Sequence, residues 1–141
     1  MHLGELITGM QQAWNAGDGA AWGAHFAEDA DFVDAVGRIQ RGRAVIADEH
    51  QKIFDTIYRG SVLEIRQLGV RQLGDDLLLL HTGSTLQVPA GPREGTVDAV
   101  QTKLVRGGLI HAFHNTARVS LAAVTENDPE LAGRSPLDWK S

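Results

Sequence analysis

Residues 13–43 read AWNAGDGAAWGAHFAEDADFVDAVGRIQRGR, and this stretch decides the fold that the sequence predicts. It contains the end of one amphipathic helix, a short second helix that ends in FAEDA, and a strand that carries Asp34. Gly17 is suited to end the first helix, since glycine tolerates the left-handed backbone conformation. Asp18 is suited to cap the second helix, because its carboxylate accepts hydrogen bonds from unpaired backbone amides. Gly37 then allows a tight turn after the strand.

Apolar residues at helical spacing predict a helix on each side of this stretch. The first helix has an apolar face formed by Leu3, Leu6, Ile7, Met10 and Trp14. In the short second helix, Trp22 and Phe26 are expected to share a face. A third helix is expected over residues 44–58, with one stripe formed by Ile46, His50, Ile53, Phe54 and Ile57.

Beyond residue 60 the pattern of apolar and polar residues becomes that of strands. Four strands are expected, over residues 61–72, 77–88, 96–106 and 109–121. In the first of them, Leu63 and Ile65 share one face. Leu68 and Val70 share the other face, which predicts a bulge near residues 67–69. Helices followed by an antiparallel meander are typical of an α+β domain.

The composition is that of one globular domain. The chain has 141 residues, of which 43% are hydrophobic and 22% are charged, and these values are ordinary for a globular protein. We expect the domain to span residues 1–124 and a polar tail to span residues 125–141. No apolar run approaches the roughly 20 residues of a membrane span, and the N-terminus does not resemble a signal peptide. A cytoplasmic protein without a membrane contact is therefore expected.

Charge and motif content argue against several classes of function. The net charge of −5 and the lack of a Lys/Arg cluster argue against nucleic-acid binding. His111 and His114 fall on opposite faces of one strand, so they cannot bind one metal ion together. His25 and His50 lie on different helices, and neither has a second ligand at helical spacing. With no phosphate-binding loop and no dinucleotide fingerprint, neither a metal nor a cofactor is expected.

Asp34 is the first candidate for chemistry. In the expected strand it alternates with Val33 and Ala35, so it shares a face with Phe32. If Phe32 faces the interior, burial would raise the pKa of the Asp34 carboxyl and suit it to proton transfer near neutral pH. The alternative is that Asp34 ends the strand and accepts hydrogen bonds from the turn at Gly37.

His50 is the second candidate, because it occupies a position on the apolar stripe of the third helix where leucine would be ordinary. It lies one helical turn from both Ile46 and Phe54. One interpretation is a buried histidine whose hydrogen bonds are satisfied within the core. The other is an acid–base partner of Asp34, provided that the two side chains come within hydrogen-bond distance.

Further residues are candidates for binding a substrate in a pocket. Aromatic side chains that could pack against a planar ligand are Trp14, Phe32 and Phe54. Gln101 interrupts an apolar strand face and Asn115 has the parity of Phe113, so either amide could point into the pocket. Phe113 and His114 have opposite parity, so only one of them can face the cavity. His81 is a weaker candidate of the same kind.

The chain resembles the SnoaL-like branch of the NTF2-like superfamily, of the DUF4440 type. The resemblance rests on the order of elements in residues 13–43 and on FHNT at residues 113–116. It implies a cone of curved mixed or antiparallel sheet wrapped around three N-terminal helices, with a central pocket. The chain most resembles small NTF2-like proteins found with enediyne polyketide biosynthesis, through the motifs WNAGD (14–18), RGRAVI (41–46), IYRGS (57–61) and FHNT.

The resemblance also narrows the range of reactions that we expect this chain to catalyse. Steroid isomerases of this superfamily carry a general-base aspartate on the first strand, at the position that Asp34 matches. Their two acidic oxyanion donors match Met10 and the neighbourhood of Gln101, so both donors are missing here. Without them a dienolate loses its main electrostatic stabilisation, and steroid isomerase activity is not expected. The acid–base aspartate of the SnoaL cyclases is likewise absent near His114 and Asn115.

Three functions remain open from the sequence, of which a purely structural or interaction role as a dimer is the least favoured. The first is a cofactor-independent acid–base enzyme of secondary metabolism that acts on a polyketide-type or other aromatic or hydrophobic metabolite, with Asp34 as base and His50 as its partner. The second is a non-catalytic binding or carrier protein for such a ligand. In either case the convex face of the sheet, which the helices cannot cover, predicts a homodimer through that face.

Overall fold

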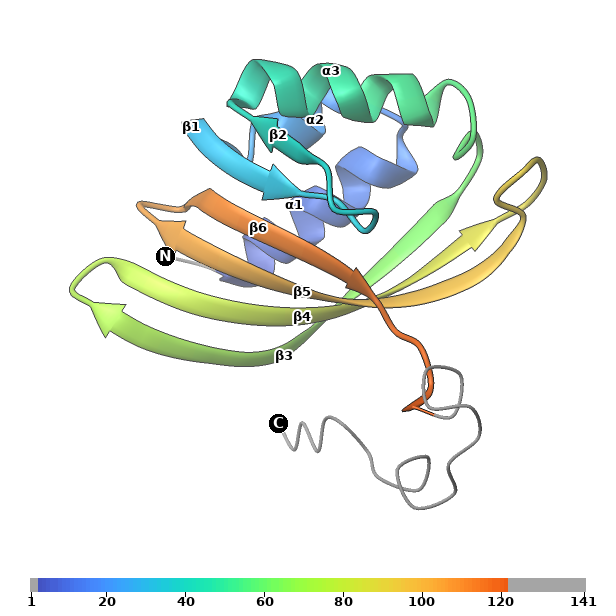
Figure 1. Ribbon diagram of the computed structural model, residues 1–141. Coiled ribbons are helices and arrows are strands. Elements are labelled where there is room, and N and C mark those ends of the chain that lie inside the picture. The colour runs from blue at the N-terminus through green and yellow to red at the C-terminus, as the bar shows by residue number, and fades with distance from the viewer. Residues whose placement is uncertain (1–2, 122–141) are drawn as a thin grey trace.

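The computed structural model describes residues 3–121, and the expected tail over residues 125–141 lies outside them. The helices are α1 (Leu3–Asn15), α2 (Gly19–Gly23) and α3 (Arg43–Phe54). The strands are β1 (Phe26–Val33), β2 (Ile39–Arg41), β3 (Val62–Gly74), β4 (Leu77–Val88), β5 (Gly95–Arg106) and β6 (Leu109–Ala117). Together they form the mixed α+β cone that the sequence predicts, with all three helices on the concave side of a curved sheet (Figure 1).

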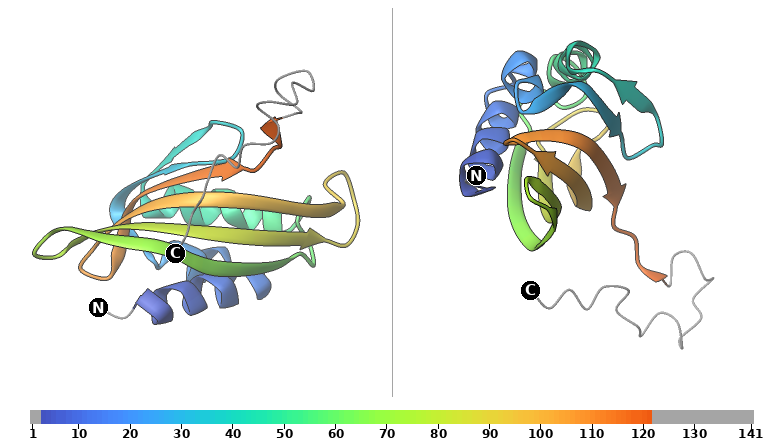
Figure 2. Two further views of the ribbon diagram at one scale, coloured as in Figure 1. Left: turned by 90° about the horizontal axis from the view of Figure 1, so that it is seen from below. Right: turned by 90° about the vertical axis from the view of Figure 1, so that its left-hand side faces the viewer.

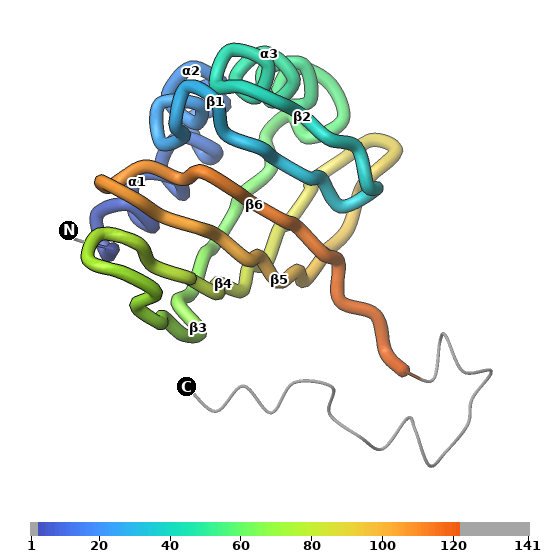
Figure 3. The backbone as a smooth tube through the Cα atoms, turned by 60° about the vertical axis from the view of Figure 1, so that its left-hand side comes forward, coloured from blue at the N-terminus to red at the C-terminus, as the bar shows by residue number. Residues whose placement is uncertain are grey.

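The sheet has the order β2-β1-β6-β5-β4-β3, in which only β1 and β6 are parallel neighbours. The short β2 lies at the edge beside β1, and the long strands β3 to β6 make the curved wall (Figure 3). The pairing of β3 with β4 shifts register between Gln67 and Gly69, so the predicted bulge is confirmed. Because a bulge bends its strand, this shift helps to curl the sheet around the helices.

Helix α1 covers the other edge of the sheet, which β3 forms (Figure 2). The Asn15 side chain donates to the carbonyl of Leu63 at 3.2 Å and accepts from the backbone amide of Leu63 at 2.7 Å. Gln11 accepts from the amide of Ile65 at 2.9 Å. These amide side chains satisfy backbone groups that an edge strand would otherwise leave unpaired. The Trp14 indole adds a buried hydrogen bond of 2.9 Å to Ser61 Oγ.

Four predicted boundaries are wrong, one of them at β6, which ends at Ala117 and not at residue 121. The segment FAEDA begins β1 and does not end α2, so Phe26 shares no helix face with Trp22. The reason is long-range pairing, because the amide of Ile110 in β6 donates to the carbonyl of His25 and draws the following residues into the sheet. The strand also ends at Val33, which places Asp34 in the turn beyond it. Helix α3 ends at Phe54 and not near residue 58.

The contact between α2 and α3 depends on a glycine. Gly19 follows the N-cap Asp18, whose carboxylate accepts from the amide of Ala21 at 3.0 Å, as the sequence predicts. A Cβ added at Gly19 would lie 2.5 Å from the carbonyl oxygen of Ala47 and 2.9 Å from the amide nitrogen of Gln51. Both are backbone atoms of α3, so the helices could not stay this close if residue 19 had a side chain.

We therefore expect Gly19→Ala to lower the free energy of unfolding by about 1–3 kcal/mol, the usual cost of overpacking. Gly4→Ala is the matched control, because a Cβ at Gly4 in α1 meets no atom within 4 Å. That control should be neutral or stabilising by up to about 1 kcal/mol, since alanine favours helix. Urea denaturation measures both changes, and a Gly19→Ala variant as stable as wild type would contradict the described packing.

Candidate functional site

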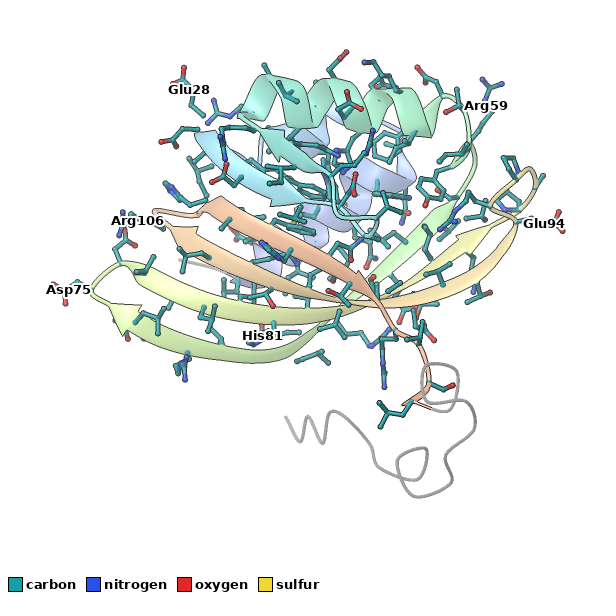
Figure 4. All side chains as sticks on the ribbon, in the orientation of Figure 1. Glu28, Arg59, Asp75, His81, Glu94 and Arg106 are labelled. Atoms are coloured by element: carbon teal, nitrogen blue, oxygen red, sulfur yellow. The ribbon has the colours of Figure 1, made fainter. Side chains whose placement is uncertain are left out.

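A cavity of about 290 Å³ lies between the concave face of the sheet and the helices. Side chains from the strands and from α3 point towards this space (Figure 4). The aromatic residues in its wall are Trp14, Trp22, Phe32, Tyr58 and Phe113. Such a largely apolar cavity with a few polar groups is typical of a small-molecule site.

Seven of the nine predicted site residues line this cavity: Trp14, Phe32, Asp34, His50, Gln101, Phe113 and Asn115. Phe54 does not, because it packs within the core with its ring centroid 4.8 Å from that of Trp14. His114 is exposed, since strand alternation turns it away when Phe113 faces inward. The weaker candidate His81 lies between the buried residues Leu80 and Thr82 on β4, which places it on the outer face.

Asp34 organises the turn between β1 and β2. Its Oδ1 accepts from the backbone amides of Val36 at 3.1 Å and Arg38 at 2.9 Å. Its Oδ2 accepts from Arg38 Nε at 2.9 Å and from Gln40 Nε2 at 3.4 Å. Burial is the largest single influence and raises the pKa of Asp34, but these hydrogen bonds and the Arg38 charge together lower it below its ordinary value. The expectation of a raised pKa is therefore wrong. The alternative is confirmed, because Asp34 follows the end of the strand and accepts hydrogen bonds from the turn at Gly37 as an ionised carboxylate.

His50 is held as a neutral ring in an aromatic wall. It is 3% exposed, and its ring centroid lies 4.8 Å from Phe32 and 5.1 Å from Trp22. Nδ1 lies 2.7 Å from the carbonyl oxygen of Ile46, so Nδ1 carries the proton and donates it, leaving a lone pair on Nε2. Burial lowers the pKa of His50 to about 4, although the Ile46 hydrogen bond and the Asp34 charge act in the opposite direction. Within residues 3–121, no hydrogen bond joins His50 to Asp34, so the hydrogen-bonded acid–base pair that the sequence suggested is wrong.

Five side chains on the inner face of the sheet form a hydrogen-bonded network, the inner polar ladder: Thr82, Ser84, Gln101, Lys103 and Asn115. Thr82 Oγ1 donates to Gln101 Oε1 at 2.7 Å. Gln101 Nε2 donates to Ser84 Oγ at 2.9 Å and to Asn115 Oδ1 at 3.0 Å. Lys103 Nζ donates to Thr82 Oγ1 at 2.6 Å. The ladder crosses β4, β5 and β6, so it ties the three strands together at the cavity wall.

Lys103 is the site residue that the sequence analysis missed. It is 1% exposed, and its Nζ lies 5.2 Å from the centre of the Phe113 ring. Burial lowers the pKa of Lys103 to about 7. The signal was present in the sequence, because the alternation that pointed Gln101 inward applies equally to the residue two positions later.

Two buried polar atoms in the cavity wall have no hydrogen-bond partner among the described residues. They are Trp22 Nε1, a donor, and Gln40 Oε1, an acceptor. Residues 3–121 contain no group of three or more metal-binding side chains. No helix in that range is long and apolar enough to cross a membrane.

The sequence profile described as SnoaL-like domain matches residues 7–113. Among curated proteins, no sequence matches the chain. A solved domain of unknown function with a cystatin-like fold from Nostoc punctiforme is 30% identical, has a TM-score of 0.78, and matches over 88% of this chain and 80% of its own. An uncharacterised cystatin-like protein from Caulobacter vibrioides is 26% identical, has a TM-score of 0.69, and matches over 92% and 94% of the two chains.

A hypothetical protein from Catenulispora acidiphila with a ketosteroid isomerase-like fold, solved in complex with trimethylamine, is similar in fold. It is 21% identical with a TM-score of 0.63, over 94% of this chain and 98% of its own. At this identity the likeness concerns the architecture and leaves the chemistry to the residues in the cavity.

The neutral state of His50 makes stability depend on pH. The folded pKa of about 4 lies below the unfolded value of about 6.5, so the unfolded chain binds a proton that native His50 does not. Stability is therefore lost as the pH falls from 6.5 towards 4. His50→Leu removes this titration, so the variant should gain about 2 kcal/mol relative to wild type between pH 7 and pH 4.5.

Urea denaturation of both proteins at several pH values measures this gain. His25 also has a pKa lowered by burial, but it is present in both proteins, so the difference isolates His50. Parallel stability curves for wild type and His50→Leu between pH 7 and 4.5 would contradict a neutral buried ring.

Proposed function

Because the chain belongs to the SnoaL-like domain family, we propose that it is a cofactor-independent acid–base enzyme of secondary metabolism. Its substrate would be a polyketide-type or other aromatic metabolite that carries a carbonyl group. The observation that carries this proposal is the neutral His50 ring, whose Nδ1 is committed to Ile46 and whose Nε2 is an unpartnered acceptor among the described residues.

His50 would act as the general base. The hydrogen bond from Nδ1 to the Ile46 carbonyl fixes the tautomer, so Nε2 can accept a proton from a substrate C–H or O–H group in the cavity. The imidazolium that forms would be stabilised by the negative charge of Asp34, which favours protonated His50 without contacting it. Asp34 thereby serves as an electrostatic partner and not as the proton acceptor, because its oxygens are occupied by the turn.

The inner polar ladder would bind the substrate oxygen. Both N–H groups of Gln101 are committed, one to Ser84 and one to Asn115, so Gln101 orients Asn115 and does not contact the ligand itself. Asn115 Oδ1 accepts from Gln101, and within residues 3–121 its Nδ2 has no partner. Asn115 Nδ2 and Lys103 Nζ are therefore donors that could stabilise negative charge developing on a carbonyl oxygen.

The aromatic residues in the cavity wall support an aromatic ligand. Two of them, Phe32 and Phe113, stack on each other with centroids 4.4 Å apart and an angle of 11° between their planes.

Exchange of the α-protons of 2-tetralone in D₂O tests the proposal, with proton NMR as the measurement. This bicyclic aromatic ketone combines an apolar frame with one carbonyl group. Wild type should accelerate the exchange, and His50→Asn should slow the catalysed rate by about 10²–10⁴-fold, the usual contribution of a general base. Asp34→Asn should have a smaller effect, because it removes only a charge that stabilises the imidazolium.

His114→Asn is the matched control, since His114 is exposed and does not line the cavity. This variant should catalyse exchange of the α-protons of 2-tetralone at the wild-type rate. Unchanged exchange in a folded His50→Asn variant would contradict the assignment of the base. Saturable binding of 2-tetralone without any exchange would favour the alternative function, a non-catalytic binding or carrier protein.

We also propose that the protein forms a homodimer through the convex face of the sheet. The outward positions on β4 to β6 carry partly exposed apolar side chains: Leu79, Val100, Leu104 and Ala112. Light scattering at micromolar concentration should give twice the 15.2 kDa mass of the chain, and Leu104→Glu should shift it to the monomer. A wild-type monomer at that concentration would contradict this arrangement.

A further inference from the structure

Lys103 reaches the cavity from the middle of β5, and no carboxylate in residues 3–121 forms an ion pair with it. Its Nζ lies over the Phe113 ring, and its one hydrogen bond to a described residue is to Thr82. The ionisable groups that line the same cavity are Asp34, Arg38, Glu49, His50, Tyr58 and Arg93. The two carboxylates among them are already paired with Arg38, whose nitrogens lie 2.9 Å from Asp34 and 3.8 Å from Glu49. Lys103 is therefore an amine in a largely apolar cavity, and it forms no ion pair with a described residue.

The hydrogen bonds of the inner polar ladder leave the lone pair of this amine available. The Thr82 hydroxyl has one hydrogen, and it is donated to Gln101 Oε1. Thr82 Oγ1 can therefore only accept from Lys103, so Nζ uses an N–H group in this contact and never its lone pair. When Nζ is neutral, the lone pair has no hydrogen-bond donor among the described residues.

Burial increases the fraction of Lys103 that is an uncharged amine at physiological pH. An ammonium group without a counter-ion is costly in an apolar environment, and burial lowers the pKa of Lys103 to about 7. A substantial fraction of the molecules therefore carries the uncharged amine near neutral pH. Desolvated lysines of this kind are the nucleophiles that form Schiff bases with carbonyl compounds.

We propose that Lys103 forms a Schiff base with an aldehyde or ketone bound in the cavity. The Nζ lone pair attacks the carbonyl carbon, a C–N bond forms, and one amine proton passes to the carbonyl oxygen to give a carbinolamine. The remaining amine proton then passes to the hydroxyl oxygen, the C–O bond breaks, and water leaves, with a C=N bond to Lys103 as the product. The reaction needs no oxidant or reductant. It rests on the proposed function only in requiring that the cavity takes a carbonyl compound.

His50 lies in the wall of the same cavity and is suited to assist this step. Its Nε2 lone pair can hold the proton that leaves the nitrogen and return it to the departing oxygen. Once protonated, the imine withdraws electrons from the adjacent carbon more strongly than the parent carbonyl does. The α-proton that His50 would accept then becomes more acidic, so the covalent step and the proton transfer reinforce each other.

Reductive trapping with 2-naphthaldehyde and sodium cyanoborohydride at pH 7 tests this proposal. Peptide mapping by mass spectrometry measures how fast each lysine acquires the reduced adduct. Lys103 should react at least about tenfold faster than the exposed Lys52, because Lys52 has a pKa raised by its hydrogen bonds to Asp48 and Glu49 and their charges. The Lys103 rate should fall at least about tenfold between pH 7 and pH 5 as the amine becomes protonated.

Lys103→Met should abolish the fast adduct, whereas the control Lys52→Met should leave it unchanged. The proposal is wrong if Lys103 reacts no faster than Lys52 in wild type, a comparison that needs no variant to fold. It is also wrong if no adduct forms while the anion 2-naphthoate binds wild type but not Lys103→Met. Lys103 would then be a cation that recognises an acidic ligand.

The same proteins separate this proposal from the proposed function. Wild type that traps 2-naphthaldehyde at Lys103 but does not exchange 2-tetralone would contradict the acid–base enzyme alone. Wild type that exchanges 2-tetralone through His50 but forms no adduct would contradict the Schiff base alone.

Discussion

One hydrogen bond, from Thr82 Oγ1 to Gln101 Oε1, determines the direction of every other hydrogen bond in the inner polar ladder. It commits the single hydroxyl hydrogen of Thr82, so Lys103 must be the donor in their contact. It also occupies the Gln101 oxygen, so the amide nitrogen turns towards Ser84 and Asn115. The sheet therefore presents donors to the cavity, while His50 on α3 presents an acceptor. A carbonyl compound between the two surfaces would meet the groups that proton transfer next to a carbonyl requires.

Burial dominates the pKa values of His50 and Lys103, but at Asp34 the effect of hydrogen bonding on the pKa outweighs that of burial. Two backbone amides and the Arg38 guanidinium stabilise the charged carboxylate, and together they exceed the cost of desolvation. Arg38 also approaches Glu49 on α3 at 3.8 Å, which connects the turn to the helix that carries His50. The charges of Asp34 and Glu49 favour protonated His50 and that of Arg38 opposes it, so Asp34 can help to stabilise the imidazolium without competing for the proton.

Periodicity in the sequence predicts which strand positions face inward, but it does not predict their partners. Alternation along β5 places Gln101 inward and applies equally to Lys103, which was overlooked because lysine is rarely buried. The same argument left Phe113 and His114 as alternatives, since parity alone does not say which face meets the helices. The start of β1 at Phe26 could not be predicted because it depends on pairing with β6, more than eighty residues away. The turn amides that bond Asp34 match one of the two alternatives given by the sequence, whereas its contacts with the Arg38 and Gln40 side chains depend on how the hairpin of β1 and β2 closes.

The folded protein should keep a large fraction of Lys103 as the uncharged amine in the cavity at neutral pH. A carbon-13 NMR titration of protein labelled at lysine Cε tests it most directly, with Lys103→Met providing the assignment. The structure predicts that the Lys103 resonance titrates with a midpoint of about 7. A midpoint near the ordinary lysine value of about 10.4 would mean that the buried group stays an ammonium ion at neutral pH, and it would contradict this account of the cavity.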